Sequence, residues 1–360
     1  MNTSVIKVSE ELTPEDNSLL DHAAGVIRAG GLVAFPTETV YGLGANGMDP
    51  RACAKIYEAK GRPSDNPLIL HISDMSQLHD LAAELNAHGK TLAAGFWPGP
   101  LTLVTGRTNR VPDIVSGGLD TVAVRMPSSS IARALINKSG VPIAAPSANV
   151  SGRPSSTRAE HVAADLSGKI DMIVDGGSSV LGLESTIVDV SGEVPCLLRP
   201  GTITLDDIES AVGRIEIDPA VNAEALSGSR PKAPGMAYVH YAPQAELVIV
   251  AGELGRSRKQ IFELVRARRE NAEFSSSPTN IAIVTTDENI EYYQNMPVQL
   301  FSLGKRSHPA EIAANLYDVL RALDQAEITH AFSEGFDETG VGLSIMNRLK
   351  KAAGYRVVRV

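Results

Sequence analysis

Residues 60–68, KGRPSDNPL, place cations and polar side chains along a turn that one glycine and two prolines keep from being helical. Lys60, Arg62 and Asn66 are separated by two and by four positions. Because side chains alternate along an extended chain, all three would point to the same side. Such a row of polar side chains could serve a binding site. The segment also fits an ordinary turn after a helix, where lysine, serine, aspartate and asparagine are common.

Further polar side chains follow apolar runs that predict strands. Residues 35–44, FPTETVYGLG, follow one such run, and residues 145–157, APSANVSGRPSST, follow another. Ligands of open α/β sheets bind outside the carboxyl ends of strands, and such loops offer hydroxyls and backbone N–H groups to phosphates. A plain polar loop would explain any one of these residues. Together with the loops at 183–190 and 197–204, they present Thr37, Glu38, Thr39, Tyr41, Ser147, Asn149, Ser151, Ser155, Ser185 and Arg199.

Two ionisable side chains lie within or at the end of apolar runs. Arg125 ends the run TVAVR, where an unpaired guanidinium would be costly to bury. A carboxylate is the expected partner, and either the protein or a ligand could supply it. His71 lies in LILHI, where a satisfied core histidine is more common than a catalytic one.

Composition excludes several classes of protein. The net charge of -9 argues against a broad basic surface for nucleic acid, although residues 107–158 hold seven Lys and Arg against two Asp, which suits a local anion pocket or a solvated face. Cys53 and Cys196 are too few for a disulfide framework or a cysteine zinc site. The motifs GxxxxGK[ST], HExxH and GxSxG are absent, and the eight histidines lack ligand spacing.

Alternating strand and helix patterns predict an α/β fold in two blocks. In the first block, strands are expected at 31–35, 68–72, 101–105, 121–125, 141–145, 171–175, 185–190 and 196–199, and helices at 50–60, 129–137, 158–166 and 204–213. In the second, strands are expected at 246–250, 280–285, 298–304, 329–335 and 355–360, and helices at 255–270, 309–325 and 340–353.

Residues 214–244, between the two blocks, are rich in Gly, Ser and Pro and show no sustained period, which predicts a linker. The domains are therefore expected at 1–213 and 245–360, with the linker between them. The first residues lack the apolar core of a signal peptide, and no apolar run approaches 18 residues. A cytoplasmic location and no membrane contact are expected.

Several ordered motifs resemble one known family. The spaced pattern KxR…SxN (Lys60, Arg62, Ser147 and Asn149) occurs together with FPTETVYGLG, FWPGPLTLV, TVAVRMP, STIVDV and LLRPGTIT. In these motifs residues 15–210 closely resemble the YrdC/Sua5 family, the L-threonylcarbamoyladenylate synthases of tRNA modification. The linker motif PGMAYVHYAP and the block after it resemble the longer Sua5 form, which carries a second domain.

The resemblance implies a fold and a reaction. The fold would be a twisted mixed-sheet YrdC-like domain followed by a smaller open-sheet, Rossmann-like domain. L-threonine would take up bicarbonate as a carbamate, which attacks the α-phosphorus of ATP and releases pyrophosphate. Mg²⁺ would accompany ATP, with no protein ligands assigned. The product would pass to the tRNA threonylcarbamoyl transferase machinery, which modifies adenosine 37 of tRNAs that read ANN codons.

The resemblance also implies site residues, by motif match. The four residues of the spaced pattern would be catalytic. ATP would contact Arg62, Asn66, Thr121, Ser147, Ser155, Arg199 and Tyr238. L-threonine would contact Thr39, His71, Arg125, the backbone of Ala145, and Ser185. Tyr238, with its aromatic neighbours His240 and Tyr241, would fold over the nucleotide as a lid; the alternative is that these rings pack on the second domain.

Two other functions compete with this one. A module that binds double-stranded RNA or tRNA would use the basic window at 107–158, but the acidic net charge counts against it, and only a weak tRNA contact stays open. A carbamoyltransferase of the hydrogenase-maturation type shares a similar domain. Those proteins also carry cysteine-rich zinc motifs, which two isolated cysteines cannot supply.

Overall fold

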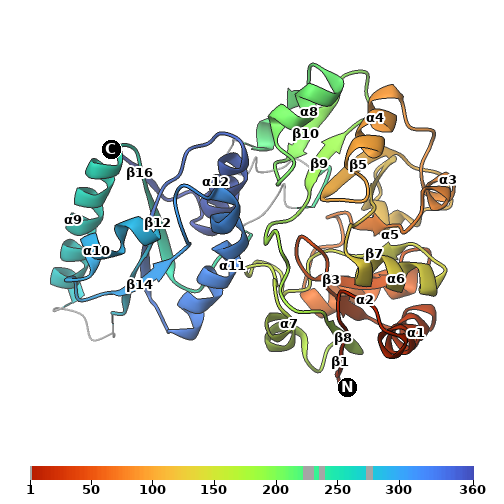
Figure 1. The fold of residues 1–360 in the computed structure, drawn as a ribbon, viewed down its shortest axis with the longest axis horizontal. Coiled ribbons are helices and arrows are strands. Elements are labelled where there is room, and N and C mark those ends of the chain that lie inside the picture. The colour runs from red at the N-terminus through yellow and green to blue at the C-terminus, as the bar shows by residue number, and fades with distance from the viewer. Residues whose placement is uncertain (1, 222–230, 235–239, 273–278) are drawn as a thin grey trace. The chain divides into compact units, whose positions relative to one another are not determined.

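The structure is a computed structural model that describes residues 2–221, 231–234, 240–272 and 279–360. The chain separates into two compact units (Figure 1). The first contains residues 1–151 and 155–238, and the second contains residues 152–154 and 239–360.

A twisted mixed sheet forms the centre of the first unit, in agreement with the expected α/β class. Among the described residues it has eleven strands in the order β1-β8-β2-β3-β7-β4-β6-β5-β9-β10-β11. The strands are β1 Ser4–Lys7, β2 Val33–Phe35, β3 Gly42–Asn46, β4 Ile69–His71, β5 Leu101–Gly106, β6 Thr121–Arg125, β7 Ile143–Ala144, β8 Met172–Asp175, β9 Thr186–Asp189, β10 Cys196–Arg199 and β11 Glu216–Ile217. The pairs β4/β6 and β5/β9 are parallel, whereas β5/β6 and β4/β7 are antiparallel, so both directions meet at the centre.

The helices of the first unit are α1 Pro14–Arg28, α2 Pro50–Lys60, α3 Leu78–Leu81, α4 Ala87–Phe96, α5 Asp113–Ser116, α6 Ser130–Ser139, α7 Ala159–Leu166 and α8 Leu205–Val212. Helix α2 has the expected bounds for a local reason. The Asp49 side chain accepts a hydrogen bond from the N–H of Arg51 at its start, and Gly61 ends it in the left-handed region, at φ 64°. This left-handed ending turns the chain into the segment that carries Arg62 and Asn66.

Apolar cores on both sides of the sheet's strands hold the first unit together, and two of them are large. One contains Leu20 and Ile27 of α1, Leu135 of α6 and Phe35 of β2. The other, larger core contains Ile56 of α2 with the central strands β3, β4, β5 and β6. The sheet is therefore covered by apolar side chains of helices, which leaves its strand ends as the places for polar groups.

Some elements were not expected from the sequence. Helices α1, α3, α4 and α5 and strands β1 and β3 were not predicted, and residues 216–217, which were expected in the linker, form β11 and pair with β10. Strand β3, GLGAN, lacks the β-branched and aromatic residues typical of strands. Its glycines are required by close packing, since a Cβ on Gly44 would come within 2.8 Å of the Phe35 ring.

The second unit is built on a parallel sheet, which agrees with the expected open α/β architecture. Its described strands follow the order β14-β13-β15-β12-β16. They are β12 Glu246–Ala251, β13 Ile281–Thr285, β14 Gln299–Ser302, β15 His330–Glu334 and β16 Val357–Arg359, joined by α9 Leu254–Ala272, α10 Ile290–Tyr293, α11 Pro309–Gln325 and α12 Val341–Ala352 (Figure 1). In the described part of the chain, no helix is both long and apolar enough to cross a membrane.

A substitution at Gly201 tests how the first unit places β9. A Cβ there would lie 2.3 Å from the backbone N of Thr186 and 2.6 Å from its Oγ1. Gly201→Ala is therefore expected to push the start of β9 aside and to lower the free energy of unfolding by about 1–3 kcal/mol. Chemical denaturation measures this change.

Gly95→Ala is the matched control. Gly95 lies within α4, and a Cβ at this position would meet nothing within 4 Å. Because alanine favours helices over glycine by about 0.5–1 kcal/mol, this variant should be as stable as the parent or more stable. Equal unfolding free energies for the two variants would contradict the packing described for Gly201.

Candidate functional site

A buried ion pair lies where β6 ends. Arg125 is 4% exposed, and its Nη2 donates to Glu38 Oε1 at 2.6 Å. Its Nη1 donates to Thr39 Oγ1 at 2.8 Å, and its Nε donates to the carbonyl of Gly99 at 3.2 Å. A guanidinium has five N–H donors, so the described residues leave one N–H on each Nη of Arg125 for a ligand. Two such N–H groups suit a carboxylate.

The neighbouring strands bring further predicted residues to this ion pair. His71 is the register partner of Arg125 across β4 and β6, and Thr102 is its partner across β5 and β6. Thr102 Oγ1 lies 2.7 Å from Ser185 Oγ, just before β9. The N–H of Ala145, beyond β7, donates to the carbonyl of Ile69 at 2.9 Å, so the backbone of Ala145 offers a ligand its carbonyl. The structure thus gathers Thr39, His71, Arg125, Ala145 and Ser185, the residues expected for L-threonine.

Electrostatics set the charges in this group. Burial would raise the pKa of Glu38, but the charge and the hydrogen bond of Arg125 outweigh burial, so the pKa lies below its usual value. Burial, helped by repulsion from Arg125, lowers the pKa of His71 to about 3. At neutral pH, Glu38 is therefore ionised and His71 is neutral, so the group carries one cation and one anion.

The second cluster joins the two parts of the spaced pattern KxR…SxN. Lys60, at the end of α2, is 2% exposed, and its Nζ donates to the carbonyls of Ser147 at 2.5 Å and of Asn149 at 2.6 Å. The N–H of Ser151 donates back to the carbonyl of Lys60 at 2.9 Å. Lys60 therefore holds the 147–151 loop against the end of α2, which places Ser147 and Asn149 beside the turn that carries Arg62.

Asn66 is the clearest sign of a ligand in that turn. It is 1% exposed, yet neither its Oδ1 nor its Nδ2 has a hydrogen-bond partner among the described residues. Its backbone carbonyl, by contrast, accepts from the Tyr57 hydroxyl at 3.1 Å. Buried amides are almost always paired, so this one is expected to receive a partner from water or from a ligand.

Arg199 contacts Ser185, the residue before β9. Its Nη2 donates to the carbonyl of Ser185 at 2.9 Å and to Ser185 Oγ at 3.2 Å, and its Nη1 donates to the carbonyl of Pro234 at 3.1 Å. Ser155, which is fully buried, donates to Glu184 Oε1 at 2.5 Å in the adjacent loop. Ser185 therefore contacts both a residue predicted for ATP and the strand residue opposite Arg125.

The structure does not place the other predicted residues beside these two clusters. Thr121 begins β6, about 13 Å along the strand from Arg125, on the rise of a β-strand. Tyr238 lies outside the described residues. His240 and Tyr241 belong to the second unit, where the ring of Tyr241 lies 5.3 Å from that of Tyr317 in α11. For Tyr241 the structure shows the packing that was the alternative to a lid.

Three residues of the site were not predicted to contact a ligand or to take part in the reaction. Glu38 pairs with Arg125, Thr102 shares a hydrogen bond with Ser185, and Glu184 accepts from Ser155. Glu38 stood in a loop already noted for its polar residues. Thr102 lies in a strand with no local sign of function, because only the register of β5 against β6 places it opposite Arg125.

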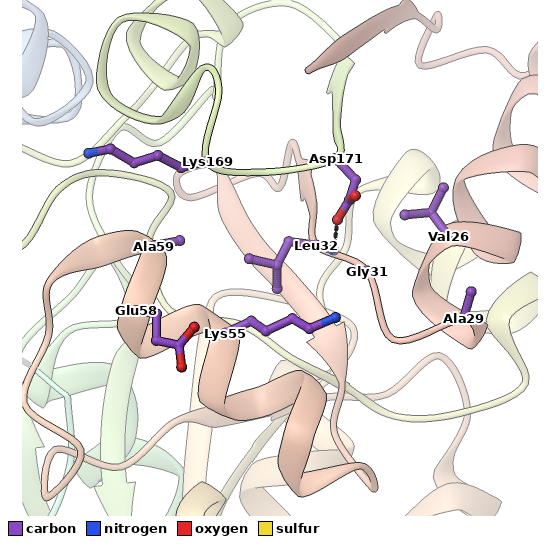
Figure 2. Close-up of a pocket in the computed structure, with 9 residues that line it drawn as sticks. All are labelled: Val26, Ala29, Gly31, Leu32, Lys55, Glu58, Ala59, Lys169 and Asp171. Atoms are coloured by element: carbon purple, nitrogen blue, oxygen red, sulfur yellow. Dashed lines mark hydrogen bonds between the residues drawn. The ribbon is translucent and has the colours of Figure 1, made fainter. Parts of the chain in front are cut away.

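A hollow of about 680 Å³ lies elsewhere in the first unit (Figure 2). It is lined by residues of α1, α2 and the segments around Gly31 and Lys169, and none of them belongs to the predicted site. Two of its charged groups already have partners, since Lys55 Nζ donates to the carbonyl of Gly30 at 2.6 Å and Asp171 Oδ2 accepts from the N–H of Leu32 at 2.7 Å.

The chemistry available to the two clusters is positioning and charge stabilisation. Burial raises the pKa of the Cys53 thiol to about 12, so at neutral pH it lacks the thiolate of a nucleophile. Within the ranges that the structure covers, no three His, Cys, Asp or Glu side chains are placed to hold a metal ion. A carboxylate at Arg125 and phosphates near Arg62 and Asn66 are the ligands that the groups present can hold.

Comparison with known proteins gives consistent matches along the chain. A Sua5, YciO and YrdC family model described as "Telomere recombination" matches residues 25–201. A model for the C-terminal domain of threonylcarbamoyl-AMP synthase matches residues 203–354. Threonylcarbamoyl-AMP synthases of Pyrococcus abyssi and Bacillus subtilis are 48% and 47% identical, over 94% and 98% of this chain and 95% and 98% of their own lengths.

A solved structure agrees with these matches. The crystal structure of P. abyssi Sua5 complexed with L-threonine has a TM-score of 0.91 with this chain at 46% identity, and the match covers 99% of this chain and all of that one.

The Glu38–Arg125 pair predicts how stability depends on pH. Glu38→Gln leaves a buried cation without its carboxylate and should lower the free energy of unfolding by about 3–5 kcal/mol. The folded-state pKa of Glu38 lies below its ordinary value of 4.5, so the pair contributes fully above that pH and is lost as pH falls through the folded-state pKa. Denaturation at several pH values should show the gap between parent and variant shrinking below pH 4.5; a constant gap would contradict the ion pair.

Proposed function

Because the chain belongs to the Sua5/YrdC family of threonylcarbamoyl-AMP synthases, we propose that it makes L-threonylcarbamoyladenylate from L-threonine, bicarbonate and ATP, with release of pyrophosphate. The observation that carries this proposal is that Ser185 lies between the Arg125 cluster and Arg199, a residue predicted for ATP. Its hydroxyl lies against Thr102, opposite Arg125, and also accepts from Arg199. An amino acid at Arg125 and a nucleotide at Arg199 would therefore be neighbours.

The amino acid would bind through its carboxylate. Arg125 offers one N–H on each Nη, and its side chain is held in place by Glu38, Thr39 and Gly99. Neutral His71 adds no second charge, so Arg125 is the cation that faces the carboxylate. The complex of P. abyssi Sua5 with L-threonine supports threonine as this ligand.

The reaction needs no covalent enzyme intermediate. The amine of threonine takes up bicarbonate and loses water, which gives a carbamate. A carbamate oxygen then attacks the α-phosphorus of ATP, and the bond to the β-phosphate oxygen breaks to release pyrophosphate. The role of the enzyme is to hold the carbamate in line with the α-phosphorus and to stabilise the developing charge.

The cations of the opening turn would act on the phosphates. Lys60 fixes the carbonyls of Ser147 and Asn149, so it orders the loop as well as placing positive charge beside it. Arg62 and the side-chain amide of Asn66, which has no partner in the described part of the chain, would contact the nucleotide directly. We propose Mg²⁺–ATP as the substrate form, with the ion held mainly by phosphate oxygens and water, which is how Mg²⁺ often binds nucleotides.

The product is a mixed anhydride, which water hydrolyses readily. We propose that it passes to the tRNA threonylcarbamoyl transferase machinery, which would place the group on adenosine 37 of tRNAs that read ANN codons. A cytoplasmic location follows from that use. Weak contact of this chain with tRNA during the transfer belongs to the same proposal.

Pyrophosphate release tests the reaction. The purified full chain, given Mg²⁺–ATP, bicarbonate and L-threonine, is expected to release pyrophosphate and to form a threonine-dependent adenylate. L-serine should react less well, because loss of the methyl contact costs on the order of 1 kcal/mol. Equal release without threonine, or formation of ADP and phosphate, would refute the proposal.

Separate substitutions of the two arginines test the assignment of the substrates. Arg62→Ala should weaken ATP binding, and Arg125→Lys should weaken threonine binding, each by about 1.5–3 kcal/mol for a lost charge-assisted contact. Lysine keeps the charge at position 125 but cannot offer two parallel N–H groups. Calorimetric titration with each ligand measures both effects.

Arg110→Ala is the control for these two variants. Arg110 is an exposed cation in the same basic window, paired with Asp80 on the surface. It should leave the affinity for both ligands unchanged. Equal losses of both ligands in Arg62→Ala and in Arg125→Lys would contradict the separation into two subsites.

A further inference from the structure

The second unit has a cluster of polar side chains at the carboxyl edge of its sheet. From β13 the chain passes to β14 on one side, whereas from β15 it crosses β12 to reach β16 on the other side. The connections of the adjacent strands β13 and β15 therefore leave in opposite directions. In open α/β sheets, this switch point at the carboxyl ends is where ligands bind. Thr285 ends β13 and Glu334 ends β15, so both lie at that point.

Glu334 organises the cluster. It is fully buried, and its carboxylate accepts from the Tyr293 hydroxyl at 2.9 Å, from Asn289 Nδ2 at 2.7 Å and from Arg306 Nη2 at 2.7 Å. The Oδ1 of Asn289 in turn accepts from Arg258 Nη2. One carboxylate thus fixes two guanidinium groups, one directly and one through an amide, and these three groups sum to a charge of +1. The Glu288 carboxylate accepts from the backbone N–H of Arg306 at 3.0 Å and adds a negative charge beside them.

The arginines are also held by aromatic rings. Arg258 lies over the ring of Tyr292, 5.1 Å from its centroid, and Arg306 lies over the ring of Phe336 at 4.8 Å. Among the described side chains, no carboxylate is within ion-pair distance of Arg258, whereas Arg306 pairs with Glu334. Arg258 is therefore a positioned cation whose charge is not neutralised by a direct partner.

Several buried polar atoms in the same place lack partners. The hydroxyls of Ser257 and Thr285 and the Nε atoms of Arg258 and Arg306 are buried and have no hydrogen-bond partner in the described part of the chain. Ser257 and Arg258 lie in the first turns of α9, which packs on β12 and β15. Since buried polar groups are nearly always paired, so many unpaired donors at one sheet edge indicate a missing acceptor.

We propose that the second unit binds a phosphate-bearing small molecule at this edge, through Arg258 and Arg306 with the hydroxyls of Ser257 and Thr285. A phosphate has oxygens enough to accept from two guanidinium groups and from hydroxyls together. The start of α9 is not the binding group, because the Glu253 carboxylate already accepts from the N–H groups of Gly255 and Arg256. This site is separate from the reaction proposed for the first unit and does not depend on it.

Calorimetric titration of the full chain tests the site. The background carries Arg62→Ala, which weakens the nucleotide site of the first unit, and the titrants are inorganic pyrophosphate and AMP. We expect binding of at least one titrant at the second unit. Arg258→Gln should weaken it about tenfold or more, as for a lost charge-assisted hydrogen bond, and Arg306→Gln added to it should weaken it further. Binding of AMP would identify a nucleotide phosphate, and binding of pyrophosphate alone would identify a free phosphate.

Two further variants control for loss of folding and for the removal of a cation elsewhere on the same helix. Arg266→Gln removes a cation that is exposed on the same helix and paired with Glu270, so it should leave binding unchanged. Thr285→Val replaces the unpaired hydroxyl by a methyl group of similar size and should weaken binding without lowering the unfolding temperature. The proposal is overturned if neither titrant binds, if Arg266→Gln weakens binding as much as Arg258→Gln, or if Thr285→Val and Arg258→Gln both leave binding unchanged. Because each comparison shares the Arg62→Ala background, failure of the reaction proposed for the first unit would not change its outcome.

Discussion

The buried charge of Arg125 is the constraint on which the first unit's site depends. A guanidinium at the end of a central strand, 4% exposed, is tolerated only if its charge and its donors are matched. Glu38 supplies the charge, while Thr39 and Gly99 supply acceptors. These contacts tie the loop after β2 to β6, and they hold the arginine in one orientation. Two N–H groups remain unsatisfied in that orientation, so the same arrangement that allows burial also prepares a place for a carboxylate.

Lys60 is also a buried cation, but the groups around it differ from those around Arg125. Its ammonium is buried and donates to two carbonyl groups of the loop after β7. The result is an ordered loop beside the turn that carries Arg62 and Asn66, which suits a polyphosphate. The lowered pKa of His71 leaves its ring neutral, so Arg125 is the cation that faces the amino acid. The two clusters therefore differ in the groups that they offer a ligand, and this difference favours two different anions.

Buried polar groups without a partner among the described residues mark the places where the fold needs a hydrogen-bond partner from water or from a ligand. In the first unit, the side-chain amide of Asn66 has no partner among the described residues, although its backbone carbonyl accepts from the Tyr57 hydroxyl. In the second unit, the hydroxyl of Thr285 and the arginines around Glu334 stand at the switch point of a parallel sheet. The units have unlike sheets, one mixed and one parallel, yet both place such groups at strand ends. Strand ends are free of the apolar helices that cover the sheet faces, so polar groups can remain there without disrupting a core.

The sequence by itself determined the elements and the kind of chemistry. Periodicity and caps gave α2, α11, β6 and β10 their observed bounds, because these signals are local to a turn or a strand. Motif residues such as Arg62 and Asn66 indicated phosphate binding. Tertiary structure alone decided which groups meet: Glu38 and Arg125 are 87 positions apart, and Thr102 reaches Ser185 only through the register of β5 against β6 and β9. Such pairs depend on how distant strands align, and nothing in the local pattern of either segment records that alignment. The glycines of β3 belong to the same class, because the need for them arises from the ring of Phe35 packed above them.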